Sequence, residues 1–419
     1  MIRYKRWIYL AVGTLLLIFC GLIYGWSLFK EPFHQVYTQW SLAQISMPFT
    51  ISMISSCLSG FAAGKLTGVL SPQKKFITAA AMVLVGFAFV SQMDPESGSR
   101  GLWTLYLCYG LLSGAGIGVA YNTVIGTVNP WFPDRPGLAS GIMMMGYGLG
   151  ALILGGVATG LIGAVGIFRT FLILGIALFV VLFIGSFIVK LPTAEELRDL
   201  QPAAAASGED AERDEILTGI GPGEMVKRAS FWVFLCWCVV INTGGMMIVN
   251  SAASIALAFG APAIVGMVVS IFNGAGRVIM GGIYDKKGAN ASMAINMAFL
   301  LSSGLLLLIG AKTSSTVLIL LGLLAMGLTY GSNLPICSTF IQRYYGPKFF
   351  SVNFSLGLFN LIPASFIGPM VGSVLVERSG GDYTTSFAVI LLCAAAAFLL
   401  WGALIRVVKR EKASQAQAS

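Results

Sequence analysis

Long apolar runs, separated by short polar segments, recur along the whole chain. Each run holds about 18 residues or more, which is enough to cross the hydrocarbon core of a bilayer as a helix. The pattern therefore predicts an all-α membrane protein with twelve membrane-spanning helices. The expected spans are 7–29, 42–66, 76–93, 102–128, 137–161, 169–190, 231–257, 262–284, 291–311, 315–341, 350–376 and 383–408.

The longest polar stretch separates the sixth span from the seventh. This stretch, 191–229, contains Pro192, the run Ala203–Ala206 and many acids, a composition typical of a flexible linker. The sequence therefore predicts an N-terminal six-helix bundle (1–190), a cytoplasmic linker with some helix (191–229), a C-terminal six-helix bundle (230–410) and a cytoplasmic tail (411–419). Parallel halves of this kind are a transporter architecture with the substrate site near the midplane.

Composition and charge placement agree with a membrane protein. The 419 residues are 57% hydrophobic and 10% charged, whereas soluble domains carry about 25% charged residues. A net charge of +9 would suit a nucleic-acid partner, but the basic residues sort by side. Of 26 Lys and Arg, 20 fall on segments that an even number of spans places with the termini, and 5 fall on the opposite segments. This bias predicts a multi-pass protein of the cell inner membrane with both termini cytoplasmic and no nucleic-acid partner.

One charge is left deep in the predicted membrane region. Arg277 lies about two-thirds along the eighth span, and none of the 17 acids lies at the centre of a span. An arginine there costs at least about 2.5 kcal/mol and does not deprotonate. Its fork of donors matches a carboxylate, so we expect the partner to be the cargo, a small organic anion. The alternative is a structural arginine that is solvated by backbone carbonyls or snorkels to an interface.

Other polar residues are candidates for the same substrate site. Asn273 lies one helical turn before Arg277 and on its face. Tyrosine and asparagine bind carboxylates or hydroxyls without the cost of a charge, but hydrogen bonding between helices explains each of them equally well. The remaining candidates are Tyr24 and Trp26 (first span), Tyr121 and Asn122 (fourth), Asn242 (seventh), Tyr330 and Asn333 (tenth) and Asn360 (eleventh).

The two halves also look like repeats. The loop Asn129–Ser140 after the fourth span and the loop Gln342–Asn353 after the tenth each hold an aromatic pair, a turn residue and a cation. In the fourth span, Gly110, Gly114 and Gly118 recur every fourth residue, which predicts a face that packs closely against a neighbouring helix. Static packing and a moving interface both require such a face.

The loop after the eighth span carries a motif that resembles the signature of the major facilitator superfamily. Gly281, Asp285, Lys286 and Gly288 match its Gly-x-x-x-Asp-Arg/Lys-x-Gly pattern, which implies a gating role. The first-half copy, Gly64–Ser71, lacks the acid, the base and the second glycine.

Within that superfamily the chain is similar to the oxalate/formate antiporter family and its monocarboxylate-porter relatives. The similarity is carried by Tyr24–Ser27, by Trp131–Gly141 with its loop charges Asp134 and Arg135, by Gly146–Gly150, by Phe231–Trp232 and by Asn273–Arg277. It implies carboxylate binding by the arginine of the eighth span, here Arg277.

Two departures from these relatives bear on the substrate. The oxalate carrier's second cation, a lysine of the eleventh span, aligns with Leu361, and the acid of eukaryotic monocarboxylate porters aligns with Asn273. One cation suits one carboxylate, because an unpaired buried charge is costly. We therefore expect a small monocarboxylate such as lactate, pyruvate or formate, carried by alternating access as anion exchange or proton-coupled symport. An oxalate/formate-type dicarboxylate antiporter and a drug or metabolite efflux carrier are the alternatives.

The sequence shows no enzyme signature. It contains no nucleophile–base pair, no metal-ligand cluster and no Gly-rich phosphate loop at a strand-to-helix turn, and so predicts no cofactor, no metal and no enzymatic activity. The expected partners are the anionic substrate, with or without a proton, and the lipid bilayer, with the protein as a monomer.

Overall fold

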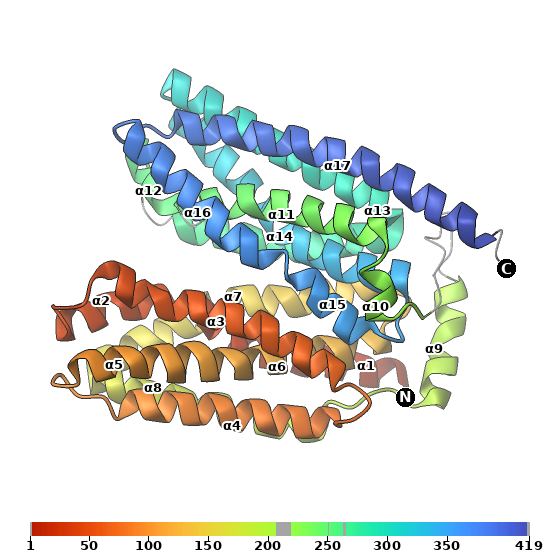
Figure 1. Ribbon diagram of the computed structural model, residues 1–419, viewed down its shortest axis with the longest axis horizontal. Coiled ribbons are helices and arrows are strands. Elements are labelled where there is room, and N and C mark those ends of the chain that lie inside the picture. Colours follow the sequence, from red (N-terminus) through yellow and green to blue (C-terminus); the bar gives the residue numbers. More distant parts are fainter. Residues whose placement is uncertain (1, 207–218, 250, 263–264, 417–419) are drawn as a thin grey trace. The chain divides into compact units, whose positions relative to one another are not determined.

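The fold is all-helical and divides into two compact units. The structure, a computed structural model, describes residues 2–206, 219–249, 251–262 and 265–416. Unit 1 is Met1–Gly208 and unit 2 is Glu209–Ser419, and each is described here by itself (Figure 1).

Unit 1 contains six membrane-length segments and a final helix outside them. Its elements are α1 (Ile2–Cys20), η1 (Gly21–Gly25), α2 (Trp26–Val36), α3 (Leu42–Lys65), α4 (Pro72–Ser91), α5 (Gly98–Thr104), η2 (Leu105–Ser113), α6 (Gly114–Val128), η3 (Asn129–Trp131), α7 (Pro136–Val165), α8 (Ile167–Ile188) and α9 (Ala194–Ala206).

Unit 2 begins with a short helix that leads into its own membrane-length segments. Its elements are α10 (Pro222–Met225), α11 (Ala229–Val249), α12 (Ala252–Ala258), α13 (Val265–Thr313), α14 (Thr316–Tyr345), α15 (Phe350–Leu358), α16 (Leu361–Arg378) and α17 (Thr384–Ala416).

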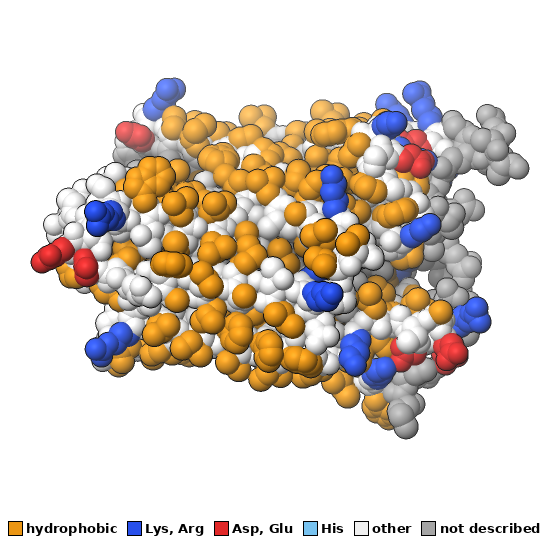
Figure 2. Space-filling model, turned by 60° about the horizontal axis from the view of Figure 1, so that its bottom comes forward, with side chains coloured by type: hydrophobic (Ala, Val, Ile, Leu, Met, Phe, Trp, Pro, Cys, Tyr) orange, Lys and Arg blue, Asp and Glu red, His pale blue; other side chains and the backbone are white. Residues whose placement is uncertain are grey.

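The number of spans follows from a break inside α13. Eleven helices within the described residues are long and apolar enough to cross a membrane. The longest, α13, contains Gly288 with φ 76°, a conformation that glycine adopts without strain. The break divides α13 into two spans, so the segments amount to the twelve predicted. Hydrophobic side chains cover the middle of the surface in view, while charged side chains gather toward its ends (Figure 2), as expected for helices that face lipid.

Four spans differ in detail from the uninterrupted helices that the sequence predicts. The fourth passes through π-helical geometry over Leu105–Ser113, between α5 and α6. The first changes from α to 3-10 geometry over Gly21–Gly25 and continues as α2. The seventh ends as α11 at Val249, with α12 as a separate short helix. The eleventh is interrupted between Leu358 and Leu361. Hydropathy does not reveal such breaks, because the residues on both sides are equally apolar.

The same glycine-mediated helix crossing occurs once in each unit. In unit 1, a Cβ on Gly118 would overlap the backbone oxygen of Ser56, so the glycine allows α6 to pack directly on α3. In unit 2, a Cβ on Gly331 would overlap the backbone oxygen of Asn273, which brings α14 directly onto α13. The predicted close-packing face of the fourth span is therefore confirmed, and the two crossings are matching features of the repeated halves.

Candidate substrate-binding site

Arg277 lies in unit 2 on the first half of α13, and only 2% of its surface is exposed. The backbone around it is fixed by α14, because Gly276 packs so closely on Leu328 that a Cβ would lie 2.5 Å from the backbone oxygen of Leu328. The Ser332 hydroxyl lies at this crossing, where it donates to the backbone oxygen of Leu328 at 2.7 Å and lies 3.4 Å from that of Gly276. The structure thus holds a guanidinium out of bulk solvent, on a rigid part of the unit.

Asn273 lies half-exposed on the same helix, one turn before Arg277. Its Oδ1 accepts no hydrogen bond from the residues that the structure describes. A buried amide oxygen without a donor is costly, which makes this oxygen available to a hydroxyl or a protonated carboxyl of a ligand. Arg277 and Asn273 therefore share one helix face beside α14.

Three other candidates in unit 2 bind neighbouring parts of the protein. Asn242 of α11 donates from Nδ2 to Oδ1 of Asn360 at 2.5 Å, which ties α11 to the interruption in the eleventh span. Asn333 of α14 donates to the backbone oxygen of Cys238 at 3.3 Å. These bonds give Asn242, Asn333 and Asn360 a role in joining helices. Hydrogen bonding between helices is the alternative to substrate binding that the sequence left open for these residues. Tyr330 packs on Gly245 of α11, whose added Cβ would lie 2.6 Å from the tyrosine ring.

Unit 1 contains a cluster of three tyrosines. The ring of Tyr147 on α7 lies 5.1 Å from that of Tyr24 and 4.8 Å from that of Tyr121. Tyr24 belongs to the 3-10 segment, where Gly21 allows the chain to touch the backbone oxygen of Tyr147. The structure thus brings together two predicted site residues with one that was missed. The signal for Tyr147 was present in the sequence, since it lies between two glycines of the resembling stretch Gly146–Gly150.

Trp26 and Asn122 lie in more enclosed surroundings of unit 1. Trp26 is 1% exposed, donates from Nε1 to the backbone oxygen of Ile45 at 2.8 Å, and packs against Tyr109 with ring centroids 4.4 Å apart. These contacts place it in the core of the unit rather than with the three tyrosines. Asn122, on α6, is also 1% exposed.

Three of the predicted gating residues, Asp285, Asp134 and Arg135, form ion pairs near helix ends. Asp285 lies 3.5 Å from the guanidinium of Arg343 at the end of α14, next to the break at Gly288. The other two motif positions, Gly281 and Lys286, lie within α13 on either side of Asp285. The sequence analysis missed Arg343, although the charge near the end of the tenth span was a visible signal.

In unit 1 the corresponding ion pair joins different elements. Asp134 lies 2.7 Å from Arg6 of α1 and 3.7 Å from its neighbour Arg135. Beside this pair, Lys5 binds Glu196 of α9 at 2.6 Å. This hydrogen bond lowers the pKa of the Glu196 carboxyl below its usual value, with a smaller contribution from the Thr193 backbone. Helix α9, within the predicted linker, is thereby attached to the start of α1.

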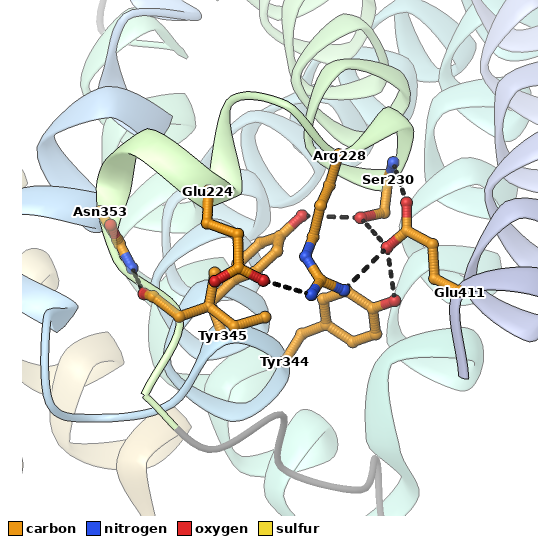
Figure 3. A network of polar contacts seen from close by, with 8 residues as sticks. Glu224, Arg228, Ser230, Tyr344, Tyr345, Asn353 and Glu411 are labelled. Carbon is orange, nitrogen blue, oxygen red and sulfur yellow. Dashed lines mark hydrogen bonds and ion pairs between the residues drawn. The ribbon is translucent and has the colours of Figure 1, made fainter. Parts of the chain in front are cut away.

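A further polar network, which the sequence analysis did not foresee, closes one end of unit 2 (Figure 3). Glu411 of α17 accepts hydrogen bonds from the backbone nitrogen of Ser230 at 3.0 Å and from its hydroxyl at 2.7 Å. It also accepts one from the Tyr344 hydroxyl at 3.1 Å and lies 3.7 Å from Arg228. The carboxylate thus fastens the ends of α17 and α14 to the start of α11, where the helix dipole favours a negative charge.

These features define a class of protein. Two units of membrane-length helices, each with its own glycine crossing and with one buried cation in the second unit, form the framework of a membrane transporter. The solved structure of the proton:xylose symporter XylE has the same fold, with a TM-score of 0.71 over 94% of this chain and 95% of that one, at 13% identity.

The family follows from the sequence comparison. The Major Facilitator Superfamily model matches residues 11–365, and the chain belongs to this superfamily of transporters, which are not enzymes. It is 25% identical to the oxalate:formate antiporter of Oxalobacter formigenes over 94% of this chain and 90% of that protein. It is 24% identical to monocarboxylate transporter 10 of Mus musculus over 77% of this chain and 62% of that protein.

Proposed function

We propose that this transporter carries small monocarboxylates such as lactate, pyruvate or formate by alternating access, and that Arg277 binds their carboxylate group. The observation that carries the proposal is the burial of the Arg277 guanidinium, at 2% exposure, on a membrane-spanning helix. A buried guanidinium binds a carboxylate through two parallel, charge-assisted hydrogen bonds. The relatives named for oxalate, formate and monocarboxylates support the same class of substrate.

The residues around Arg277 favour one carboxylate over two. Leu361, which opens α16 directly after the interruption, is apolar and 8% exposed. It occupies the position at which the resemblance to the oxalate carrier implies a second cation. Asn273 is neutral and carries no titratable proton. A dicarboxylate would therefore bring one carboxylate into the unit without a cation to face it, at a cost of several kcal/mol.

The oxalate:formate type of antiport is the second candidate, because the protein of that name matches over nearly the whole chain. A drug or metabolite efflux carrier is the third. We further propose that the protein lies in the cell inner membrane as a monomer. The end of unit 1 at which α1 starts and the end of unit 2 at which α17 finishes would face the cytoplasm.

A substrate screen in proteoliposomes tests the proposal. Uptake of labelled lactate, pyruvate and formate should exceed uptake of oxalate. Uptake of each of these acids should exceed uptake of a lipophilic cation. Vesicles containing the Arg277→Lys variant provide the matched control. Lysine retains the positive charge but lacks the paired hydrogen-bond donors of the guanidinium. Transport of the lipophilic cation with no transport of the acids would contradict the proposal, and preference for oxalate would favour the second candidate.

A further inference from the structure

The degenerate motif copy in unit 1 contains a buried lysine. Lys75, in the first turn of α4, is 5% exposed, and its Nζ donates to Oγ1 of Thr67 at 2.8 Å. Thr67 itself is exposed and belongs to the turn between α3 and α4. Lys75 is therefore buried, and its ammonium donates to the hydroxyl of an exposed residue.

The helices around Lys75 contain no acid. The helices that pack on α4 with the most contacts are α8 and α6, while α3 leads into the turn, and none of the sequences of these four helices contains Asp or Glu. Within the described residues, no carboxylate lies at ion-pair distance from Lys75. A buried ammonium that binds only a neutral hydroxyl is costly, and the start of α4 adds the positive end of a helix dipole.

The rest of the turn matches one kind of anion. Lys65 and Lys74 are exposed on either side of it. Between them, Leu66 is 41% exposed and Val69 is 78% exposed. The turn lies at the end of a membrane span, at the same end of unit 1 as the N-terminus (Figure 1). Cations beside exposed aliphatic side chains at this depth match a phosphate group with acyl chains attached.

We propose that Lys75, Lys74, Lys65 and Thr67 form a binding site for the headgroup of an anionic phospholipid, with Leu66 and Val69 against its acyl chains. The phosphate supplies the negative charge that the helices around Lys75 lack. The Thr67 hydroxyl accepts from Lys75 and donates to the backbone oxygen of Ala63 at 3.4 Å, so its role in the site is to hold the Lys75 ammonium in place. This site gives the α3–α4 turn a lipid ligand where the complete motif of unit 2 has the Asp285–Arg343 ion pair.

Competition between two lipids on the purified full chain tests this site. Native mass spectrometry should show a preference for phosphatidylglycerol over phosphatidylcholine of about fivefold for each lysine that binds it. Lys75→Met should lower that preference by about fivefold, and Lys75→Arg should retain it. Lys75→Met should also be at least as stable as the native protein in phosphatidylcholine, since the variant no longer buries a charge.

A second variant and a soluble anion complete the test. Val69→Asp changes an exposed side chain, so it should fold normally and repel the anionic lipid. Lys286→Met, which removes an exposed cation of unit 2, is the matched control. It should leave unchanged the share of the phosphatidylglycerol preference that is due to Lys75. An undiminished preference in both Lys75→Met and Val69→Asp would overturn the proposal. Displacement of the lipid by millimolar inorganic phosphate would also overturn it, in favour of a soluble-anion site.

Discussion

In the proposed function, a single arginine in unit 2 selects the cargo. The Arg277 guanidinium stays charged at every physiological pH, so it attracts an anion throughout. Its neighbour Asn273 adds an oxygen that the described part of the protein leaves without a donor. A small 2-hydroxy acid presents the matching groups, because its carboxylate suits the guanidinium and its hydroxyl suits the amide.

At the same scale, Leu361 accounts for the proposed preference for monocarboxylates. Leu361→Lys should add a second cation near the eleventh-span interruption and increase oxalate affinity about tenfold, the effect of one added charged hydrogen bond. Oxalate binding to the purified variant measures this gain. Leu361→Met is the control for packing, since it keeps size without adding charge. Unchanged oxalate affinity in a folded Leu361→Lys variant would contradict the one-cation argument.

Glu196 gives a prediction about pH. Its folded-state pKa lies below the usual glutamate value of about 4.5, because Lys5 and the Thr193 backbone bind the ionised form. Its contribution to docking α9 is thus fully present above about pH 4.5 and is lost as the pH falls through the depressed value. The protection factor for amide exchange over Ala194–Leu200, which corrects for the intrinsic pH dependence of exchange, should stay high at pH 6 and fall below pH 4.5. In Glu196→Gln it should be low at both, and an identical profile in the variant would exclude this role.

At the scale of helices, glycines decide how closely the site helices pack. Gly331→Ala would place a Cβ onto the backbone oxygen of Asn273. We expect a loss of about 1–3 kcal/mol of stability from overpacking, together with weaker substrate binding, because α13 carries both Asn273 and Arg277. Gly282→Ala on the same α13 is the matched control, since its Cβ would have nothing within 4 Å. Thermal unfolding and substrate binding measure both variants, and equal behaviour would refute this packing role.

The sequence predicts the spans well and the interruptions poorly. Hydropathy identifies the twelve apolar segments and the polar break at Gly288, because lipid imposes a strong and uniform requirement on each span. It does not locate the interruption at Asn360, whose Oδ1 accepts a hydrogen bond from Asn242 of α11.

The polar candidates show a similar limit. Arg277 stands out in the sequence because a charge in a span is rare. A tyrosine or an asparagine is common in spans, and its side chain can either contact a ligand or join two helices. Only the structure distinguishes the Tyr24–Tyr121–Tyr147 cluster from the enclosed Trp26, since both depend on the 3-10 segment that turns the first span. Likewise, Arg6 and Arg343 were visible as charges, but their partners Asp134 and Asp285 come from distant parts of the chain.

At the scale of the whole molecule, the proposed carboxylate site leads us to expect exchange. A transporter that returns empty must carry the buried Arg277 charge through its cycle without its anionic substrate, whereas one that returns loaded does not. Preloading proteoliposomes with unlabelled substrate should therefore accelerate uptake of labelled substrate several-fold. Equal uptake at all preloads, together with stimulation by an inward proton gradient, would favour symport instead.

The most direct test of the central claim measures carboxylate binding to purified protein by calorimetry, with Arg277→Lys as the variant and Arg343→Lys as the control at a helix end. Loss of the bidentate pair should weaken binding of the best monocarboxylate by about 10- to 100-fold in Arg277→Lys and leave it nearly unchanged in Arg343→Lys. Native affinity in a folded Arg277→Lys protein would contradict the assignment of Arg277 as the carboxylate-binding residue.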